Sequence, residues 1–360
     1  MKILKFGKLT IGGPRTIVIA EVADSHNGDI KTAKKLVEEA KKAGADVAKF
    51  QIHLPEVEMA GPGALVMWDG DLYDILKRNL FTPAMHKEMI KHCAKVGIEY
   101  LCTPFCPAAV DILNDLGVKA FKTGSGELAN LPHHRKIARI SASTGKPVIV
   151  STGMSTWEEI RETVRVYEEE NAKENLALMN CTSEYPPNDY SHLNLGVIGK
   201  LRDEFGVWVG QSDHAHKNYV ALAAAAVTMG AKLIEKHFTL SRQQKGPDHA
   251  ISLEPGMLKD LVDGVRATEL ALGVTKMISK EEQVVRDWAF HSVIVDRSVK
   301  KGEAVTVKNV RPARPGPSYK NWGGIQAKYL DDLYSHQLLG KTFKKNLPKN
   351  HRLRWSDLWS

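Results

Sequence analysis

The chain has 360 residues, of which 43% are hydrophobic and 26% charged, with a formal net charge of +8. These values are ordinary for a globular protein whose core needs no staples. The four cysteines include no CxxC pair, which excludes a disulfide scaffold and predicts reduced thiols. The chain starts without a signal-peptide pattern and has no apolar run of about 18 residues, so we expect a cytoplasmic protein.

The positive charge does not define a binding surface, because the lysines are spread along the chain. The segment 31–44 mixes lysine with glutamate, as solvated helix faces do. A basic balance without a recognition motif is weak support for a nucleic-acid partner. We therefore expect neither nucleic acid nor membrane as a partner, and the charge is compatible with a small anionic substrate.

The first three quarters of the chain repeat one pattern eight times, in which a short β-branched run precedes a stretch of helical period. Eight such repeats in fewer than about 300 residues predict a closed α/β barrel, the (β/α)8 or TIM fold. The predicted strands are 16–22, 46–52, 99–104, 120–125, 147–152, 176–182, 207–213 and 232–238. The predicted helices are 30–43, 83–96, 107–116, 132–144, 156–169, 192–204, 219–229 and 255–272.

Two parts of the chain depart from this pattern. The connection from Ile52 to Pro83 contains a Gly-Pro-Gly sequence and Trp68, and its length predicts a lid over the catalytic face. The repeats end near residue 272, which closes a predicted catalytic domain of residues 1–272. Residues 273–287 are polar and predict a linker. Residues 288–360 predict a small β-rich domain, with strands at 292–295 and 304–306 and a proline-rich turn at 311–317.

The predicted strands end in polar or titratable residues. Reacting groups of a (β/α)8 barrel come from the carboxyl ends of its strands, where packing alone would favour apolar side chains. The residues at these ends and in the loops that follow them are Glu21, Lys49, Gln51, Thr103, Lys122, Ser125, Glu127, Ser151, Ser183, Tyr185, Ser212, Asp213, His214, Glu235, Lys236, His237 and Asp248.

Two lysines, Lys49 and Lys122, lie inside apolar runs. A buried ammonium is costly unless it is paired, so each lysine is either a structural partner of a carboxylate or a clamp for an anion. The small residues 123–126, Thr-Gly-Ser-Gly, favour the clamp, because their backbone N–H groups can approach an oxyanion.

Two histidines, His214 and His237, fall at the ends of the seventh and eighth strands, which are neighbours in a barrel. A pair of neutral imidazoles can bind a divalent metal and leave positions open for water and substrate. Asp248 and Glu235 could add oxygen ligands. The alternative is that both histidines are core residues with satisfied hydrogen bonds.

An ordered set of motifs links these residues to a known family. The segment AEVADSHNGDIKTAKKLVEEAKKAGADVAKFQ is followed by CTPF, KTGSGEL, STGMST, CTSEYP, GQSDHA, EKHFTL and GPDHAISLEP. In this order they resemble the sialic acid synthase family over nearly the whole length. The tail HSVIVDRSVKKGEAVTVKNVRPARPGP is similar to the antifreeze-like (SAF) domain that closes these enzymes.

The resemblance implies a reaction, a cofactor and an assembly. The reaction condenses phosphoenolpyruvate (PEP) with an N-acetylated amino sugar, expected to be N-acetylmannosamine, and gives a sialic acid and phosphate by C–O cleavage. A divalent metal, expected to be Mn²⁺ with Mg²⁺ or Co²⁺ as alternatives, would activate the sugar aldehyde. The expected assembly is a domain-swapped homodimer.

The resemblance also implies roles for individual residues. His214 and His237 would hold the metal, and Glu21 or Glu127 would handle the attacking water. Gln51, Asp248 and Arg314 would face the sugar, with Arg314 reaching in from a partner chain. The residues implied to surround PEP are Lys49, Thr103, Lys122, Ser125, Ser151, Ser183 and Tyr185.

Other functions stay open at this stage. A legionaminic or pseudaminic acid synthase, or a synthase of a sialic acid 9-phosphate, would have the same motifs. Octulosonate and heptulosonate synthases lack the antifreeze-like tail, which argues against them. A non-catalytic sugar-binding relative is the alternative of another class, and the retained lysines and histidines argue against it.

Overall fold

A computed structural model describes residues 1–63, 66–67, 70–316 and 323–359 of the chain. The chain divides into two compact units, Met1–Gly273 and Val274–Ser360, and each is treated by itself below. The first unit therefore ends within a residue of the predicted catalytic domain.

The first unit is built on eight parallel strands in the order β7-β4-β3-β12-β11-β10-β9-β8. The two end strands, β7 and β8, also contact each other, so the sheet closes into a barrel. The predicted (β/α)8 fold is confirmed. The strands are β3 (Ile17–Glu21), β4 (Val47–Ile52), β7 (Glu99–Pro104), β8 (Phe121–Thr123), β9 (Val148–Ser151), β10 (Leu176–Cys181), β11 (Trp208–Asp213) and β12 (Leu233–His237).

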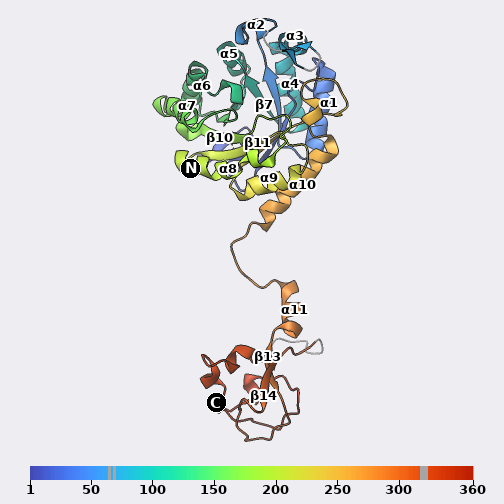
Figure 1. Ribbon diagram of the computed structural model, residues 1–360, viewed down its shortest axis with the longest axis vertical. Helices are drawn as coiled ribbons and strands as arrows, with labels where there is room; N and C mark the ends of the chain where they lie inside the picture. Colours follow the sequence, from blue (N-terminus) through green and yellow to red (C-terminus); the bar gives the residue numbers. More distant parts are fainter. Residues whose placement is uncertain (64–65, 68–69, 317–322, 360) are drawn as a thin grey trace. The chain divides into compact units, whose positions relative to one another are not determined.

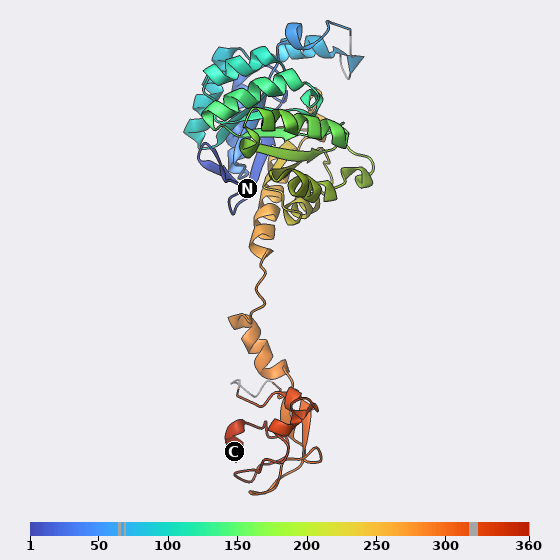
Figure 2. The same cartoon turned by 90° about the vertical axis from the view of Figure 1, so that its left-hand side faces the viewer.

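Helices lie outside this barrel in both views (Figures 1 and 2). Their apolar faces and the outward side chains of the strands form the main hydrophobic core. Among the described residues, no helix is long and apolar enough to cross a membrane. The helices are α1 (Ile30–Lys42), α4 (Pro83–Val96), α5 (Pro107–Asp115), α6 (Leu131–Thr144), α7 (Trp157–Glu169), α8 (Gly196–Phe205), α9 (Tyr219–Thr228) and α10 (Pro255–Ala271).

One predicted helix starts later than expected. The sequence predicted helix over 192–204, whereas residues 190–193 form a single 3-10 turn and α8 begins at Gly196. Asn194 has a φ of 42° between them. This left-handed conformation, which asparagine tolerates better than most residues, interrupts the helix.

The amino-terminal end of the barrel is closed by a hairpin that the sequence analysis missed. Its strands are β1 (Leu4–Phe6) and β2 (Leu9–Ile11), which pair antiparallel around Gly7. Leu4, Phe6 and Ile11 are buried among the inward side chains of the barrel strands. The hairpin therefore fills this end, which leaves the opposite end for a site.

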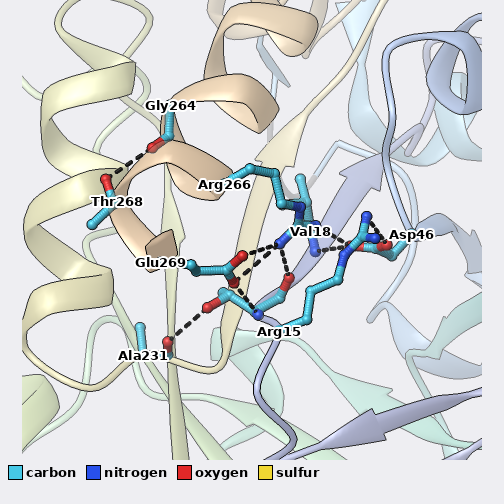
Figure 3. Close-up of polar contacts among 9 residues, drawn as sticks. Arg15, Val18, Asp46, Ala231, Gly264, Arg266, Thr268 and Glu269 are labelled. Atoms are coloured by element: carbon cyan, nitrogen blue, oxygen red, sulfur yellow. Dashed lines mark hydrogen bonds and ion pairs between the residues drawn. The ribbon is translucent and has the colours of Figure 1, made fainter. Parts of the chain in front are cut away.

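A polar network near the hairpin ties α10 to the barrel (Figure 3). The Asp46 carboxylate accepts hydrogen bonds from the Val18 N–H at 2.9 Å and from Arg266 at 2.8 Å. Arg266 also donates to the Thr16 carbonyl at 2.7 Å. Arg15 forms a second ion pair with Asp46, at 2.9 Å. Because Asp46 is nearly buried, these bonds hold α10 against β3.

We predict that Asp46→Asn lowers the free energy of unfolding by about 2 kcal/mol, because hydrogen bonds to a buried charge are each worth about 1.5–3 kcal/mol. Urea unfolding measures this change. Asp111→Asn is the matched control, since its ion pair with Lys136 is exposed and should change stability by less than about 1 kcal/mol. Equal losses in the two variants would contradict this role of the network.

The long connection after β4 contains structure of its own. It carries α2 (Pro55–Glu58), the short strands β5 (Val66–Met67) and β6 (Gly70–Asp71), and α3 (Leu72–Asn79). In Figure 2 this blue segment stands at one end of the first unit. Trp68, which the sequence analysis placed in a lid, lies outside the described residues.

The second unit differs from the prediction in two places. A helix, α11 (Lys280–Ala289), occupies most of the predicted linker 273–287, and a capping box between Ser279 and Glu282 begins it. Strand β13 (Ser292–Val295) was predicted, but its partner is β14 (Val310–Ala313), in residues read as a proline-rich turn. The pair has only two strands, where proline is tolerated at an edge. Ala304 forms only an isolated bridge with Thr342.

Candidate active site

A cavity of about 510 Å³ lies at the carboxyl ends of the barrel strands. Leu72 and Leu76 of α3 form part of its wall, so the long connection does contribute to it. A larger hollow of about 860 Å³ lies at the other barrel end, and no strand-end residue of the predicted site lines it. The predicted site residues that line the 510 Å³ cavity are Glu21, Lys49, Gln51, Thr103, Lys122, Ser125, Glu127, Ser151, Tyr185, His214, His237 and Asp248.

Two lysines and two carboxylates meet at the floor of this cavity. Lys49 Nζ donates to Glu235 Oε1 at 2.7 Å and lies 3.4 Å from Glu21 Oε2, while Lys122 Nζ lies 4.0 Å from Glu235 Oε2. All four side chains are buried. Burial opposes every charge here, yet Lys122 and Lys49 hold the pKa of Glu235 below its usual range. The sequence allowed Glu235 as an oxygen ligand of a metal. In the structure its carboxylate lies against the two lysines.

Glu21 is the less stabilised carboxylate of this group. Burial raises its pKa above the usual range, although Lys49 acts in the opposite direction. Burial also lowers the pKa of Lys122. A buried cluster of two cations and one ionised carboxylate has a net positive charge, which an anionic ligand would neutralise.

Hydroxyl groups surround Lys122 on one side. Its Nζ donates to Ser151 Oγ at 2.6 Å, and Ser125 Oγ accepts from the Gly153 N–H at 3.0 Å. A Cβ atom on Gly153 would lie 2.5 Å from Ser183 Oγ and 2.7 Å from Ser125 Oγ. Glycine is therefore required for the three groups to approach. Ser183 lies beside the cavity and does not line it.

Glu127 faces the cavity from the short 3-10 turn after β8. Its carboxylate packs over Gly124, where a Cβ would lie 2.5 Å from Oε2. Burial raises the pKa of Glu127 to about 7, with Lys122 acting in the opposite direction. A carboxyl group with this pKa can exchange a proton near neutral pH.

The two histidines lie close together, with ring centroids 5.3 Å apart. His214 Nδ1 is 2.7 Å from the Thr182 carbonyl and must donate to it, which leaves Nε2 with a free lone pair. His237 Nδ1 lies 3.6 Å from Asp248 Oδ2. Burial lowers the pKa of each imidazole to about 3, so both are neutral, the form that binds metals.

This arrangement fits a divalent metal held by two protein nitrogens. His237 Nδ1 is buried without a hydrogen-bond partner, as a nitrogen reserved for a ligand would be. Within the described residues, no group of three or more His, Cys, Asp or Glu forms a metal cluster. The other ligands of such an ion would therefore come from water and substrate.

A chain of hydrogen bonds leads away from Glu21, and the sequence analysis did not single out its outer members. Gln51 Nε2 donates to Glu21 Oε1 at 2.7 Å, and Gln51 Oε1 lies 3.0 Å from His53 Nε2. His53 Nδ1 lies 2.6 Å from Glu58 Oε1. Side chains two residues apart along a strand point to the same face. The spacing of His53 from Gln51 could therefore have predicted that the two side chains lie on one face.

One predicted site residue lies in the other unit. Arg314 follows β14 and is exposed in the second unit. The thirteen other residues that the resemblance assigned to the site line the cavity or, for Ser183, lie next to it. Asp213 and Lys236, which were also predicted from their strand ends, pair with each other at 2.6 Å and do not line it. Fold and site together define a (β/α)8-barrel enzyme whose cavity has a lysine-bearing and a histidine-bearing side.

Comparisons with known proteins agree with this class. Residues 36–277 match the model of the NeuB family. The chain is 38% identical to the N,N'-diacetyllegionaminic acid synthase of Campylobacter jejuni, over 94% of this chain and 99% of that protein. It is 33% identical to the human N-acetylneuraminate-9-phosphate synthase, over 82% and 83% of the two chains.

A solved structure agrees as well. The N-acetylneuraminic acid synthetase of Leptospira borgpetersenii, in complex with citrate, superposes with a TM-score of 0.68 at 27% identity. The match covers 79% of this chain and 96% of that one. The chain belongs to the NeuB family, and it is an enzyme of the sialic acid synthase type.

Proposed function

We propose that the protein condenses PEP with an N-acetylated amino sugar and water to give a nonulosonic acid and inorganic phosphate. The observation that carries this proposal is the cavity itself, which joins two buried lysines and the hydroxyls of Ser125 and Ser151 to a pair of neutral histidines. PEP is a small polyanion, and a sugar aldehyde is the electrophile that such a site can activate. Relatives named as sialic, legionaminic and pseudaminic acid synthases support the same reaction class.

PEP would occupy the side of the cavity formed by Lys49 and Lys122. There the phosphate would accept hydrogen bonds from the serine hydroxyls of Ser125, Ser151 and Ser183, and Lys122 would neutralise its charge. Thr103 Oγ1 is buried without a hydrogen-bond partner and is available to the PEP carboxylate. Tyr185 would close this side, between PEP and the histidines; its ring centroid lies 4.1 Å from that of His214, with the two rings tilted by 37°.

The new carbon–carbon bond would form between C3 of PEP and the aldehyde carbon of the sugar. The electron pair of the PEP double bond leaves C2 electron-poor, and water adds there. The tetrahedral product then breaks its C2–O bond to phosphate and leaves a 2-keto acid. Glu21 or Glu127 would take the proton of the attacking water.

His214 and His237 would hold a divalent metal, with Mn²⁺ the first candidate and Mg²⁺ or Co²⁺ the alternatives. Such an ion supplies Lewis-acid polarisation of the aldehyde oxygen. Gln51 and Asp248 would contact the sugar hydroxyls.

We further propose a homodimer in which Arg314 of one copy completes the sugar side of the other. Sedimentation of the purified chain as a monomer would contradict this last part.

A phosphate-release assay with a panel of sugars tests the function. N-acetylmannosamine, its 6-phosphate and the sugar precursors of legionaminic and pseudaminic acid are each supplied with PEP and Mn²⁺. We expect phosphate only when PEP and one acceptor are both present. The legionaminic precursor is the second candidate acceptor, since two synthases of N,N'-diacetyllegionaminic acid are 38% and 33% identical to the chain. Phosphate release from none of them would refute the proposal.

The pH dependence of Glu127→Gln identifies the base. If Glu127 must be ionised, the turnover of the unchanged protein falls as pH drops below about 7, because its pKa is raised to about 7. Glu127→Gln should lower kcat by about 10²–10³-fold, and the turnover that remains should no longer fall as pH drops below about 7. Glu162→Gln, on the exposed face of α7, is the control. If the turnover of Glu127→Gln still falls at low pH, the proton transfer is assigned to Glu21.

A further inference from the structure

The hydrogen-bond chain from Glu21 to α2 has a consequence for the site. Its members are Glu21, Gln51, His53 and Glu58, and the successive bonds measure 2.7, 3.0 and 2.6 Å. The outer pair is well buried, with side-chain exposures of 10% for His53 and 7% for Glu58. The ring of His53 is also held by stacking on Phe105 at 4.1 Å.

The donors and acceptors of this chain can be assigned from its outer end. A carboxylate only accepts hydrogen bonds, so the Nδ1 atom of His53 carries the hydrogen shared with Glu58. Glu58 is fixed in turn, because its second oxygen accepts from the Leu54 N–H at 3.0 Å. The ring of His53 therefore has one orientation, with Nε2 directed at Gln51.

The amide of Gln51 is the one member that can be reversed. Its oxygen and nitrogen are nearly the same size, so only its neighbours decide which of them faces Glu21. An amide oxygen only accepts, so with the Gln51 oxygen toward His53 the Nε2 atom of the ring also carries a hydrogen and donates it, while the Gln51 NH₂ group donates to Glu21. This orientation holds Glu21 in place as a hydrogen-bond acceptor, directed into the cavity where the acceptor sugar and water would be.

We propose that Glu58 and His53 are positioning residues that set the orientation of the Gln51 amide and, through it, that of Glu21. The inference rests on the proposed function and goes beyond it, since Glu58 does not line the cavity and His53, which does, is assigned an effect through Gln51. It also gives the long connection after β4 a defined task, because Glu58 belongs to α2. The short helix α2 and Glu21 are then coupled through three hydrogen bonds.

Glu58→Gln tests the proposal. The glutamine keeps the size of the side chain, but it can present either an oxygen or an NH₂ group to His53 and no longer fixes the ring. We expect kcat to fall about tenfold and the KM for the sugar to rise, while the KM for PEP stays within twofold. The matched control is Glu56→Gln on the same helix, whose side chain is 72% exposed and pairs with Lys77. It should leave all three constants unchanged.

A second readout does not depend on activity. In protein labelled with ¹⁵N-histidine, the ring resonances of His53, assigned with His53→Gln, report which nitrogens carry hydrogen. They should shift in Glu58→Gln and stay unchanged in Glu56→Gln. His53→Gln should itself lower kcat as Glu58→Gln does, which covers the case that one variant folds poorly.

The outcomes separate this proposal from the proposed function. A normal kcat in either Glu58→Gln or His53→Gln would overturn the positioning role. So would ring resonances of His53 that stay unchanged in Glu58→Gln. If the unchanged protein released no phosphate with any sugar, the proposed function would fail. The ring resonances would then still decide whether Glu58 orients His53.

Discussion

Replacing His237 by alanine is expected to abolish turnover and Mn²⁺ binding while the barrel stays folded. His237 and His214 are neutral imidazoles that line the cavity with ring centroids 5.3 Å apart, and His237 Nδ1 has no hydrogen-bond partner. Loss of a ligand from a two-histidine site should lower Mn²⁺ affinity by more than 10²-fold. Loss of Lewis-acid activation should lower kcat by at least about 10³-fold, which corresponds to several kcal/mol.

Calorimetric titration with Mn²⁺ measures the first effect, and phosphate release measures the second. His92→Ala is the control, because that histidine pairs with Glu38 on the outer helices and lies away from the cavity. Chelation of the unchanged protein should stop turnover, and added Mn²⁺ should restore it. Mn²⁺ bound by His237→Ala as tightly as by His92→Ala would contradict the metal assignment.

Lys122→Met is expected to give the second largest effect, a fall of about 10²–10³-fold in kcat/KM for PEP. The variant removes a buried cation whose Nζ donates to Ser151 and lies near Glu235. A charge-assisted hydrogen bond is worth about 1.5–3 kcal/mol, so two such bonds to PEP are worth at least about 3 kcal/mol, and each 1.4 kcal/mol is a tenfold change in binding. The sugar KM should change much less, because Lys122 lies on the phosphate side.

Steady-state kinetics at saturating sugar, together with PEP titration, measure this loss. Lys119→Met removes a charge three residues earlier, where the side chain is exposed at the other barrel end, and should leave kcat/KM unchanged. An equal rise in the KM for both substrates of Lys122→Met would place Lys122 elsewhere in the reaction.

Most of the barrel could be predicted because its elements are long and strongly patterned. All eight strands and seven of the eight helices lie within two residues of their predicted bounds. The hairpin β1–β2 was missed because each strand has only three residues, although Gly7 between two alternating runs was a usable signal. The helix α11 was missed because its residues are polar and its main signal is the capping box at Ser279.

The residues of the site could be predicted because a parallel barrel brings its strand ends to one face. Their partners could not, since these come from strands far apart in sequence. Lys49 pairs with Glu235, 186 positions away, and this contact shows that Glu235 serves the lysines. The chain through His53 was missed although its outer members are close in sequence, with His53 two residues from Gln51 and five from Glu58. Glu58 reaches it only because α2 folds back over the end of β4, in a connection without a repeating pattern.

The most direct test of the proposed condensation follows the oxygen atoms. The purified protein, PEP, Mn²⁺ and an active amino sugar react in H₂¹⁸O, and mass spectrometry weighs the phosphate as it forms. The site predicts that water attacks C2 of PEP, so phosphate keeps its original oxygens and a nonulosonic acid appears in equal amount. Phosphate that carries ¹⁸O, or phosphate without the nine-carbon acid, would contradict it.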